Sequence, residues 1–206
     1  MGSLPPRLLA LIPLAVGLNV AMGQFAAATS LPLFLDAVGT VLVAALTGLV
    51  PALLTGLISQ LAFTALSGNS TWLAFLPVQL AIAVYATAVA RAGLFATLPR
   101  AVLAGLGLGL LAALLSWPIS YFAFGGVTAG GVTVITALLV GLGLPLKWSV
   151  LAASLSNDLL DKSVTFLLVR SVLLALPKRL AARFPDAQRS LRRQPAVESS
   201  DPPAGP

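Results

Sequence analysis

Three stretches without a single charged side chain constrain this chain most: residues 8–35, 37–90 and 101–146. A soluble domain of 206 residues needs a charged surface around its core, yet only 9% of these residues are charged and 58% are hydrophobic. Each stretch is long enough for at least one helix of about 20 apolar residues, the length that crosses a bilayer. The sequence therefore predicts an all-α integral membrane protein.

The residue types that the chain lacks exclude several classes of function. It contains no histidine and no cysteine, so it has no imidazole or thiolate for zinc or haem, no Cys–His nucleophile and no disulfide. We therefore expect no metal and no cofactor. Of its 12 basic and 6 acidic residues, six basic and three acidic ones lie after residue 177, so this short tail carries half of the net positive charge. A basic tail beside a membrane span is a topology signal, and we expect no nucleic acid as a partner.

Apolar runs separated by proline, glycine and charged residues divide the chain into about six transmembrane segments: 8–28, 36–49, 51–66, 72–91, 101–124 and 148–176. The second is short for a span, and Pro51 separates it from the third. These two are expected to form a tight helical hairpin or a tilted, partly re-entrant pair. The first also has features of a cleavable signal peptide, with Arg7 before its apolar run. We predict a transmembrane substrate-binding domain over residues 1–177.

Basic residues near the segment ends predict the orientation in the membrane. Arg7, the pair Arg91 and Arg100, and the basic residues after Pro177 all fall on one side if six helices cross the bilayer. Because cytoplasmic loops carry the excess of Lys and Arg, we expect these regions in the cytoplasm and the chain in the cell membrane. Only Lys147 lies against this rule. Residues 178–206 are predicted to be a basic cytoplasmic tail without stable structure, because they are rich in Pro, Ser and Arg.

The segment before the last span differs from the others. Gly125 to Gly131 is rich in glycine, and residues 132–146 are apolar but too short for a further span with its loops. We expect a glycine-rich loop on the outer face followed by a short helix. Such a segment is either a lid over a ligand, with the glycines as its hinge, or a loop packed permanently on the helices.

Ionisable residues in the predicted spans form one polar patch. A charged side chain in a span costs roughly 2.5–3.5 kcal/mol on insertion scales, so each needs a partner, a cavity or a function. The patch consists of Asn157, Asp158, Asp161 and Lys162 in the last segment and Asp36 at the start of the second. Spacings of three and four residues place the first four on one helix face. The patch is either a structural Asp158–Lys162 ion pair, which leaves Asp36 and Asp161 without a counter-charge, or part of a binding site.

Polar and aromatic side chains in other segments fall at a similar predicted depth. At about 1.5 Å of rise per residue, they lie in the outer half of the bundle, whereas the inner halves are almost purely apolar. They are Gln24, Gln60, Gln79, Trp117 and Tyr121. Each glutamine alone is typical of a hydrogen bond between helices. Together with the patch, these residues predict a substrate-binding cavity open to the outside.

Small residues recur every four positions in three segments and indicate close helix packing. They are Ala101, Gly105, Gly109 and Ala113, then Ala44 and Gly48, then Ala86 and Ala90. Such stripes serve packing within the bundle or docking to another membrane protein. The chain has no Walker motif, GxGxxG motif or nucleophile elbow. We therefore expect no ATP hydrolysis from this chain itself and no enzymatic activity.

Three motifs give the chain a resemblance to a known family. They are Leu31-Pro32-Leu33-Phe34-Leu35-Asp36-Ala37-Val38-Gly39-Thr40, the Gly125 to Gly131 stretch, and Asn157-Asp158-Leu159-Leu160-Asp161-Lys162, with Leu176-Pro177 closing the last span. Over residues 8–180 the chain resembles the substrate-binding S components of energy-coupling factor (ECF) transporters, vitamin-importing relatives of ABC transporters. The resemblance implies six helices, a pocket near the outer face closed by the first and fifth loops, and toppling of the subunit in the membrane.

The resemblance also implies partners and site residues. The partners are a transmembrane coupling protein and two cytoplasmic ATPases, and Asp36, Asp158 and Asp161 match motif positions as candidate pocket residues. Many S components contact the coupling protein through Ala-x-x-x-Ala on the first helix, which this chain lacks. Its nearest equivalents are Gly17 with Ala21 and Gly23 with Ala27. No residue set matches the thiamine, riboflavin or biotin members closely enough to name the substrate.

The sequence thus predicts a capture subunit that binds a small water-soluble nutrient or vitamin from outside and relies on partner ATPases for import. Three alternatives stay open. One is a membrane sensor or scaffold whose patch is structural and whose basic tail binds anionic lipid or a cytoplasmic partner. Another is an autonomous secondary transporter driven by a proton on Asp161. The third is an acid–base enzyme that uses Asp158 and Asp161.

Overall fold

The computed structural model describes residues 6–29, 31–128, 131–184 and 186–191, and every regular element in them is a helix. This confirms the predicted all-α class. The helices are α1 (Pro6–Ala28), α2 (Val38–Thr47), α3 (Leu49–Ser67), α4 (Thr71–Ala74), α5 (Leu76–Arg91), α6 (Leu98–Pro118), the π-helical turn η1 (Ile119–Ala123), α7 (Gly131–Gly141), α8 (Leu146–Ala175), α9 (Lys178–Ala181) and α10 (Ala187–Ser190).

Three helical stretches of the described chain are long and apolar enough to cross a membrane: Ala10–Ala28, Leu49–Ser67, and Leu98–Ala123, which combines α6 with η1. Helices α2, α5 and α7 are apolar but shorter. Large apolar side chains point outward from these elements, as Leu14 and Leu103 do with exposed fractions of 72% and 67%. Such outward-facing leucines suit a lipid environment, so the structure supports a membrane protein.

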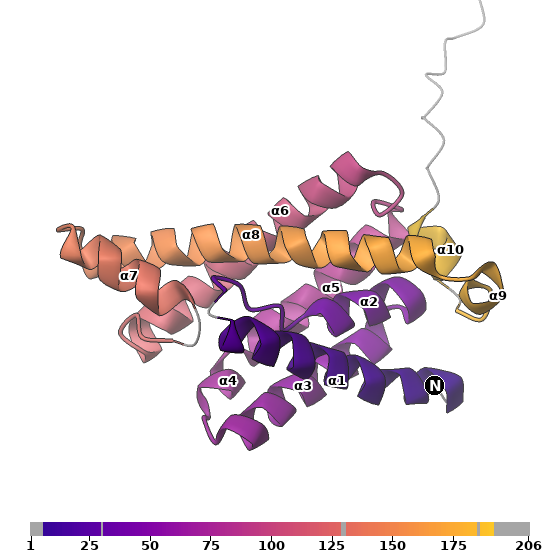
Figure 1. Ribbon diagram of the computed structural model, residues 1–206, viewed down its shortest axis with the longest axis horizontal. Coiled ribbons are helices and arrows are strands. Elements are labelled where there is room, and N and C mark those ends of the chain that lie inside the picture. The colour runs from indigo at the N-terminus through magenta and orange to yellow at the C-terminus, as the bar shows by residue number, and fades with distance from the viewer. Residues whose placement is uncertain (1–5, 30, 129–130, 185, 192–206) are drawn as a thin grey trace, which may run out of the picture.

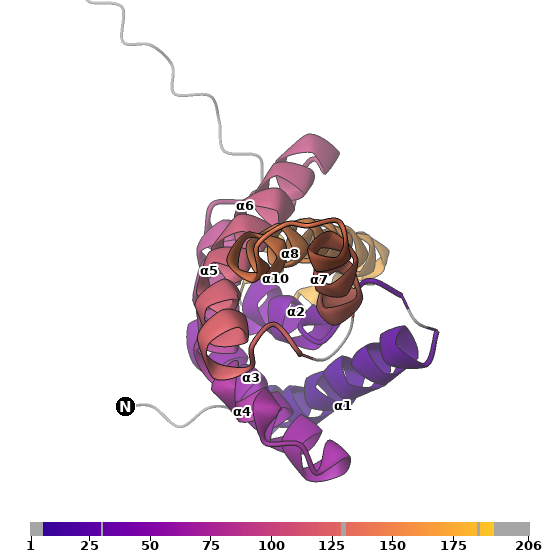
Figure 2. The same cartoon turned by 90° about the vertical axis from the view of Figure 1, so that its left-hand side faces the viewer.

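The helices lie mostly along the long axis of the molecule (Figure 1). The start of α1 lies toward the same end as α9 and α10, and α4 and α7 lie toward the opposite end. Seen from the α4 and α7 end, α2 lies in the middle of the bundle (Figure 2). Nine of the ten α2 residues are buried, and α2 contacts α1, α3, α5 and α8. Helix α2, which belongs to the predicted segment that is short for a span, is therefore the central helix.

A buried asparagine joins the first three helices. The Asn19 side-chain amide in α1 donates hydrogen bonds to Thr40 Oγ1 in α2 and to Ser59 Oγ in α3, each at 2.9 Å. The backbone N–H of Gly39 donates to Asn19 Oδ1 at 2.6 Å. A Cβ on Gly39 would lie 2.1 Å from the carbonyl oxygen of Ala15. Only glycine at position 39 allows α1 to come this close to α2.

The small-residue stripe of α6 packs within the bundle. A Cβ on Gly105 would lie 2.7 Å from Ser163 Cα, and a Cβ on Gly109 would lie 2.6 Å from Leu159 Cα. Ala101 and Ala113 are also fully buried. The stripe therefore allows close packing of α6 on α8, which is one of the two roles predicted for it.

The short second helix follows a stretch of non-helical chain that enters the bundle. Residues 31–37 form no regular helix, yet Leu35 and Ala37 are 4% and 0% exposed. Helix α2 begins at Val38, and a single residue, Gly48 with φ of 86°, separates it from α3. The predicted pair of segments 36–49 and 51–66 is thus a tight pair with an irregular entry. Non-helical backbone inside such a bundle is tolerated only where its polar groups are satisfied by the protein.

The tail is more ordered than the sequence predicts, up to residue 191. Helix α10 packs against α2 and α5, and Ala187 and Ser190 are buried. The Ser190 hydroxyl donates to Ala45 O at 2.8 Å, and the Asp186 N–H donates to Leu46 O at 3.2 Å. These two bonds satisfy carbonyls at the C-terminal end of α2, which have no partner within their helix. Residues 192–206 lie outside the described residues.

Candidate functional site

A cavity lies where the irregular segment 31–37 meets the helices, and its empty volume is about 650 Å³ with its mouth included. Its lining comes from most of the elements of the bundle: Phe34 and Asp36 from segment 31–37, Gln60 from α3, Thr71 and Trp72 from α4, Phe75, Val78, Gln79 and Ile82 at and within α5, Ser116 and Ser120 from α6 and η1, Thr128, Val132 from α7, and Ser154, Asp158 and Lys162 from α8. Small-molecule sites likewise combine an apolar lining with a few polar groups that converge from several elements.

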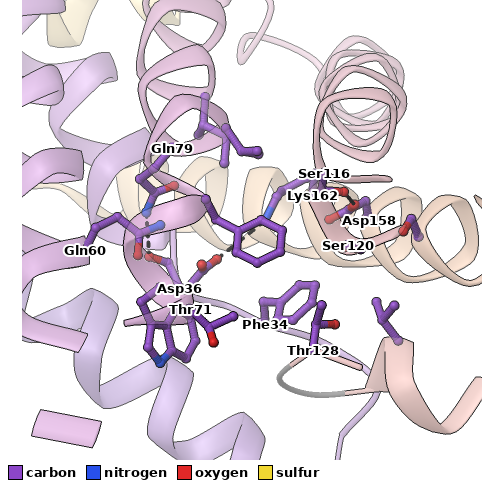
Figure 3. Close-up of a pocket in the computed structure, with 16 residues that line it drawn as sticks. Phe34, Asp36, Gln60, Thr71, Gln79, Ser116, Ser120, Thr128, Asp158 and Lys162 are labelled. Carbon is purple, nitrogen blue, oxygen red and sulfur yellow. Dashed lines mark hydrogen bonds and ion pairs between the residues drawn. The ribbon is translucent and has the colours of Figure 1, made fainter. Parts of the chain in front are cut away.

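Five of the ten predicted binding residues line this cavity: Asp36, Gln60, Gln79, Asp158 and Lys162. Figure 3 shows Asp36, Gln60 and Gln79 on one side and Ser116 and Asp158 on the other, with the Lys162 amine between them. Residues that are up to 126 positions apart in the sequence therefore meet, as the predicted convergence requires.

Asp161 faces the irregular segment rather than the cavity. Its Oδ1 accepts hydrogen bonds from the backbone N–H groups of Phe34 at 3.0 Å and Leu35 at 2.8 Å. Its Oδ2 pairs with the Lys162 amine. Leu35 has a φ of 51°, in the left-handed region that non-glycine residues seldom adopt. The Asp161 carboxylate thus holds a strained, buried stretch of backbone in place.

Two further predicted residues also bind this segment. The Asn157 side-chain amide donates to Pro32 O at 3.0 Å, and the Gln79 amide donates to Asp36 O at 3.1 Å. Gln79 therefore has two roles, because it lines the cavity as well. Each of these bonds satisfies a backbone group that has left the helical pattern.

The ion pairing of Lys162 contradicts the predicted structural pair between Asp158 and Lys162. Lys162 pairs with Asp161, and its Nζ lies 3.5 Å from Asp36 Oδ1. No ion pair joins it to Asp158 among the described residues, although the two are one helical turn apart. Asp158 instead accepts a hydrogen bond from the Ser116 hydroxyl to its Oδ2 at 3.1 Å. Lys162 pairs with Asp36 because segment 31–37 places the Asp36 carboxylate next to the Lys162 amine.

Several buried polar atoms in the cavity wall have no hydrogen-bond partner among the described residues. They are Asp36 Oδ1, Gln60 Oε1, Gln79 Oε1 and Ser154 Oγ. The side chains of Gln60, Gln79 and Ser154 belong to residues that are at most 2% exposed. An unpartnered buried acceptor costs about 1–3 kcal/mol. Four such atoms around one hollow indicate a place for a ligand or for bound water.

Aromatic rings form one side of the cavity, and the sequence analysis did not single them out. Trp72 stacks on Phe63 with ring centroids 4.5 Å apart, and Phe75 stacks on Phe124 at 6.0 Å. The Phe34 ring lies 5.9 Å from Lys162 Nζ. Ser116 and Ser154 were likewise not predicted. Phe34 lies inside the predicted motif next to Asp36, but a lone Phe, Trp or Ser in an apolar run carries no signal of a site.

Besides Asn157 and Asp161, three predicted residues lie outside this cavity. Gln24 is exposed and lines a second hollow between α1, α3 and α7. The Trp117 indole N–H donates to Lys147 O at 3.2 Å, and its ring lies 5.9 Å from Lys147 Nζ. Tyr121 packs edge-on against Phe122 at 4.9 Å. The structure therefore does not bring Gln24, Trp117 and Tyr121 to the site.

The glycine-rich segment and the short helix after it cover part of the site. The predicted short helix is present as α7, and Thr128 and Val132 contribute to the cavity wall. Gly125 and Gly126 turn the chain with φ of 56° and 83°. A Cβ on Gly131 would lie 2.8 Å from Pro32 Cα. Glycine at 131 thus lets α7 approach the irregular segment, whereas residues 129–130 lie outside the described residues.

The predicted docking residues on α1 divide between two faces. Gly17 and Ala21 are exposed, and a Cβ on Gly17 would meet nothing within 4 Å. A Cβ on Gly23 would lie 2.9 Å from the Phe63 ring, so Gly23 packs inside against α3. Ala27 is exposed but lines the second hollow. Of the two predicted pairs, only Gly17 with Ala21 forms an outward-facing surface.

Comparisons of the chain with protein-family models, with curated proteins and with solved structures give no match.

Proposed function

We propose that this protein is the substrate-capture S subunit of an ECF-type importer. In this role the chain binds a small water-soluble nutrient or vitamin from outside, and a transmembrane coupling protein with two cytoplasmic ATPases drives its release inward. The observation that carries the proposal is the cavity with four buried polar atoms that make no hydrogen bond within the described chain, of which only Asp36 Oδ1 has an ion-pair partner. Its lining includes residues of all three motifs behind the resemblance: Asp36, Thr128, and Asp158 with Lys162.

The proposed topology has six crossings, made by α1, α2 with segment 31–37, α3, α5, α6 with η1, and α8. The N-terminus, the connection from α5 to α6, and α9 with α10 are then cytoplasmic, because Arg91, Arg100 and the basic residues near the C-terminus mark that side. Residues of α4 and α7 line the cavity, and these two helices lie toward the other end of the molecule (Figure 1). This arrangement supports capture from the outside of a cell membrane.

The contacts of Asp161 favour capture over proton-driven transport and over acid–base catalysis. Asp161 does not line the cavity, and it already accepts two backbone N–H groups and pairs with Lys162. A proton carrier or a general base needs an oxygen that can reach the substrate or a water path. Of the two carboxylates that the acid–base alternative uses, Asp158 and Asp161, only Asp158 lines the cavity, and one of the pair alone supports binding better than catalysis.

The outward-facing Gly17 and Ala21 are the proposed contact for the coupling protein. Small residues on an exposed helix face let a second transmembrane helix approach closely. Leu14 and Phe25 flank them on the same face, with exposed fractions of 72% and 54%. Replacing Ala21 with Trp should impair copurification of the chain with its partner subunits from native membranes, while ligand binding by the chain alone persists.

A transport assay in sealed vesicles tests the proposal. The compound released from the purified protein by organic solvent is identified by mass spectrometry, labelled and offered to vesicles that contain this chain alone. Capture predicts saturable binding without accumulation, and accumulation only when the coupling protein and ATPases are added with ATP. Accumulation by the chain alone under a proton gradient would establish a secondary transporter instead. A ligand-free protein whose function depends on residues 178–206 would establish the sensor or scaffold.

A further inference from the structure

The charges around the cavity do not balance, and this imbalance bears on the chemistry of the ligand. Among the described residues that line it, Lys162 is the only basic one, and Asp36 and Asp158 are the acidic ones. Lys162 is already paired with Asp161 behind the wall and shares Asp36 as a second partner. Three carboxylates thus face one ammonium group, so the cluster has an excess of negative charge.

Asp158 is the carboxylate without a cationic partner among the described residues. It is 4% exposed, and the one hydrogen bond found for its side chain comes from the neutral hydroxyl of Ser116. Burying a carboxylate away from water is costly unless a cation or several donors face it. Lys162, the one basic residue of the described lining, pairs with Asp161 and Asp36 instead, and Asp158 itself lines the cavity (Figure 3).

The wall opposite Asp158 also presents hydrogen-bond acceptors, from Gln79 and Asp36. The Gln79 amide nitrogen is used by Asp36 O, which leaves Gln79 Oε1 as a free acceptor. Asp36 Oδ1 accepts no hydrogen bond within the described chain and lies 3.5 Å from Lys162 Nζ. Both walls therefore present acceptors, and acceptors are satisfied by N–H or O–H groups of a ligand.

The aromatic side of the cavity adds a place for a flat or cationic group. Trp72 and Phe75 line the cavity and are each held from behind by a stacked ring. Aromatic faces attract cations and stack on flat rings, with a contribution of about 0.5–2 kcal/mol for a cation. An anionic ligand would find no unpaired cation in the described lining.

We infer that the cavity selects a compact organic cation in which a flat ring carries N–H donors, such as an amidinium or a protonated aminoheterocycle. This inference rests on the proposed capture function and adds the charge and donor pattern of the substrate. The charged N–H groups bind Asp158, the ring lies against Trp72 and Phe75, and remaining donors reach Gln79 Oε1. Carboxylate-bearing nutrients are disfavoured, because they bring a negative charge next to Asp158.

Three probes of nearly equal size and different charge test this inference: benzamidine, benzamide and benzoate. The variant with both Trp117→Phe and Trp148→Phe leaves Trp72 as the only tryptophan. Trp72 lines both the cavity and the second hollow, so its fluorescence reports ligand in either, and dependence on Asp158, which lines only the cavity, distinguishes the two. We expect saturable quenching by benzamidine, binding of benzamide about tenfold weaker, which is about 1.4 kcal/mol, and no saturation with benzoate. In an Asp158→Asn variant of this reporter the preference for benzamidine over benzamide should disappear.

Asp186→Asn is the matched control, since it removes the same charge far from the cavity, where Asp186 pairs with Arg189. It should leave the order of the three probes unchanged. Benzoate binding as tight as that of benzamidine, or no saturable binding of any probe at millimolar concentration, would overturn the inference. An anionic compound that copurifies with the wild-type protein in stoichiometric amount would also overturn it, yet it would leave the capture function standing.

Discussion

The carboxylate of Asp161 in α8 accepts the backbone N–H of Leu35 at 2.8 Å, across 126 residues of sequence. Leu35 lies in the left-handed region, is 4% exposed and immediately precedes Asp36 in the cavity wall. This bond fixes the position from which Asp36 reaches Lys162. The stability of segment 31–37 and the shape of the site therefore depend on the same carboxylate.

Replacing Asp161 with Asn should destabilise the protein more than any other single change in the polar cluster. The variant removes the negative charge that pairs with buried Lys162 and that accepts the two backbone N–H groups. Breaking a buried ion pair costs about 3–5 kcal/mol. Thermal unfolding in detergent, followed by circular dichroism, measures the effect. Ser171→Ala is the control, because Ser171 is exposed and its hydroxyl bonds only to Leu167 O of its own helix. Equal unfolding temperatures for Asp161→Asn and Ser171→Ala would contradict the anchoring role.

Replacing Asp158 with Asn should have the opposite profile. Asn keeps the size of the side chain and an acceptor for Ser116, and Asp158 has no ion pair to lose in the described structure. We expect little change in unfolding temperature and a loss of ligand affinity of about 1.5–3 kcal/mol, the usual contribution of a charged hydrogen bond. Isothermal titration with the copurified compound measures the affinity. Unchanged affinity in a folded variant would remove Asp158 from the site.

The sequence predicts which residues belong to the polar cluster better than it predicts the role of each one. Spacings of three and four residues correctly place Asn157, Asp158, Asp161 and Lys162 on adjoining turns of one buried helix face. They do not reveal that Asn157 and Asp161 face segment 31–37 whereas Asp158 and Lys162 face the cavity. That difference arises because segment 31–37 is not helical, and a period of 3.6 residues carries no information about chain outside helices.

Other features of the site and the tail could not be predicted from the sequence for a similar reason. Gln60 and Gln79 reach one cavity from regular helices, as the predicted convergence requires. Trp117 and Tyr121 do not line it, because a similar position along a helix does not mean that two side chains face the same way. The end of α6 also changes to a π-helical turn at Ile119, which rotates Tyr121 relative to a continuous α-helix. The order of the tail up to residue 191 depends on carbonyls of α2 that the tail sequence does not show.

The contact of α6 with α8 predicts a sharp difference between two glycines. Gly109→Ala places a methyl group 2.6 Å from Leu159 Cα and should destabilise the protein by about 1–3 kcal/mol through overpacking. Gly17→Ala adds the same methyl group where nothing lies within 4 Å, and it should be neutral or stabilising by up to about 1 kcal/mol. Unfolding temperatures of both variants in one detergent test this pair. A destabilised Gly17→Ala protein with an unaffected Gly109→Ala protein would refute the packing.

The last described helix should protect the C-terminal end of α2. Ser190→Ala removes the hydrogen bond to Ala45 O and should cost about 1 kcal/mol. Hydrogen–deuterium exchange of peptides that cover residues 186–191 should become faster in the variant, and exchange of the α7 peptides should not change. Equally fast exchange of residues 186–191 in the wild-type and variant proteins would show that α10 is not packed in solution.

Native mass spectrometry of the protein purified in mild detergent from cells grown in rich medium tests whether the cavity is a capture site. We expect one small organic molecule per chain in the wild-type protein and in the Ser156→Ala variant, because the Ser156 hydroxyl is exposed on the outer face of α8. The same molecule should be absent from the Asp36→Asn and Asp158→Asn double variant, provided that this variant unfolds at a temperature close to the wild type. Wild-type protein without any bound molecule, or a double variant that retains the molecule in full, would contradict a capture site at this cavity.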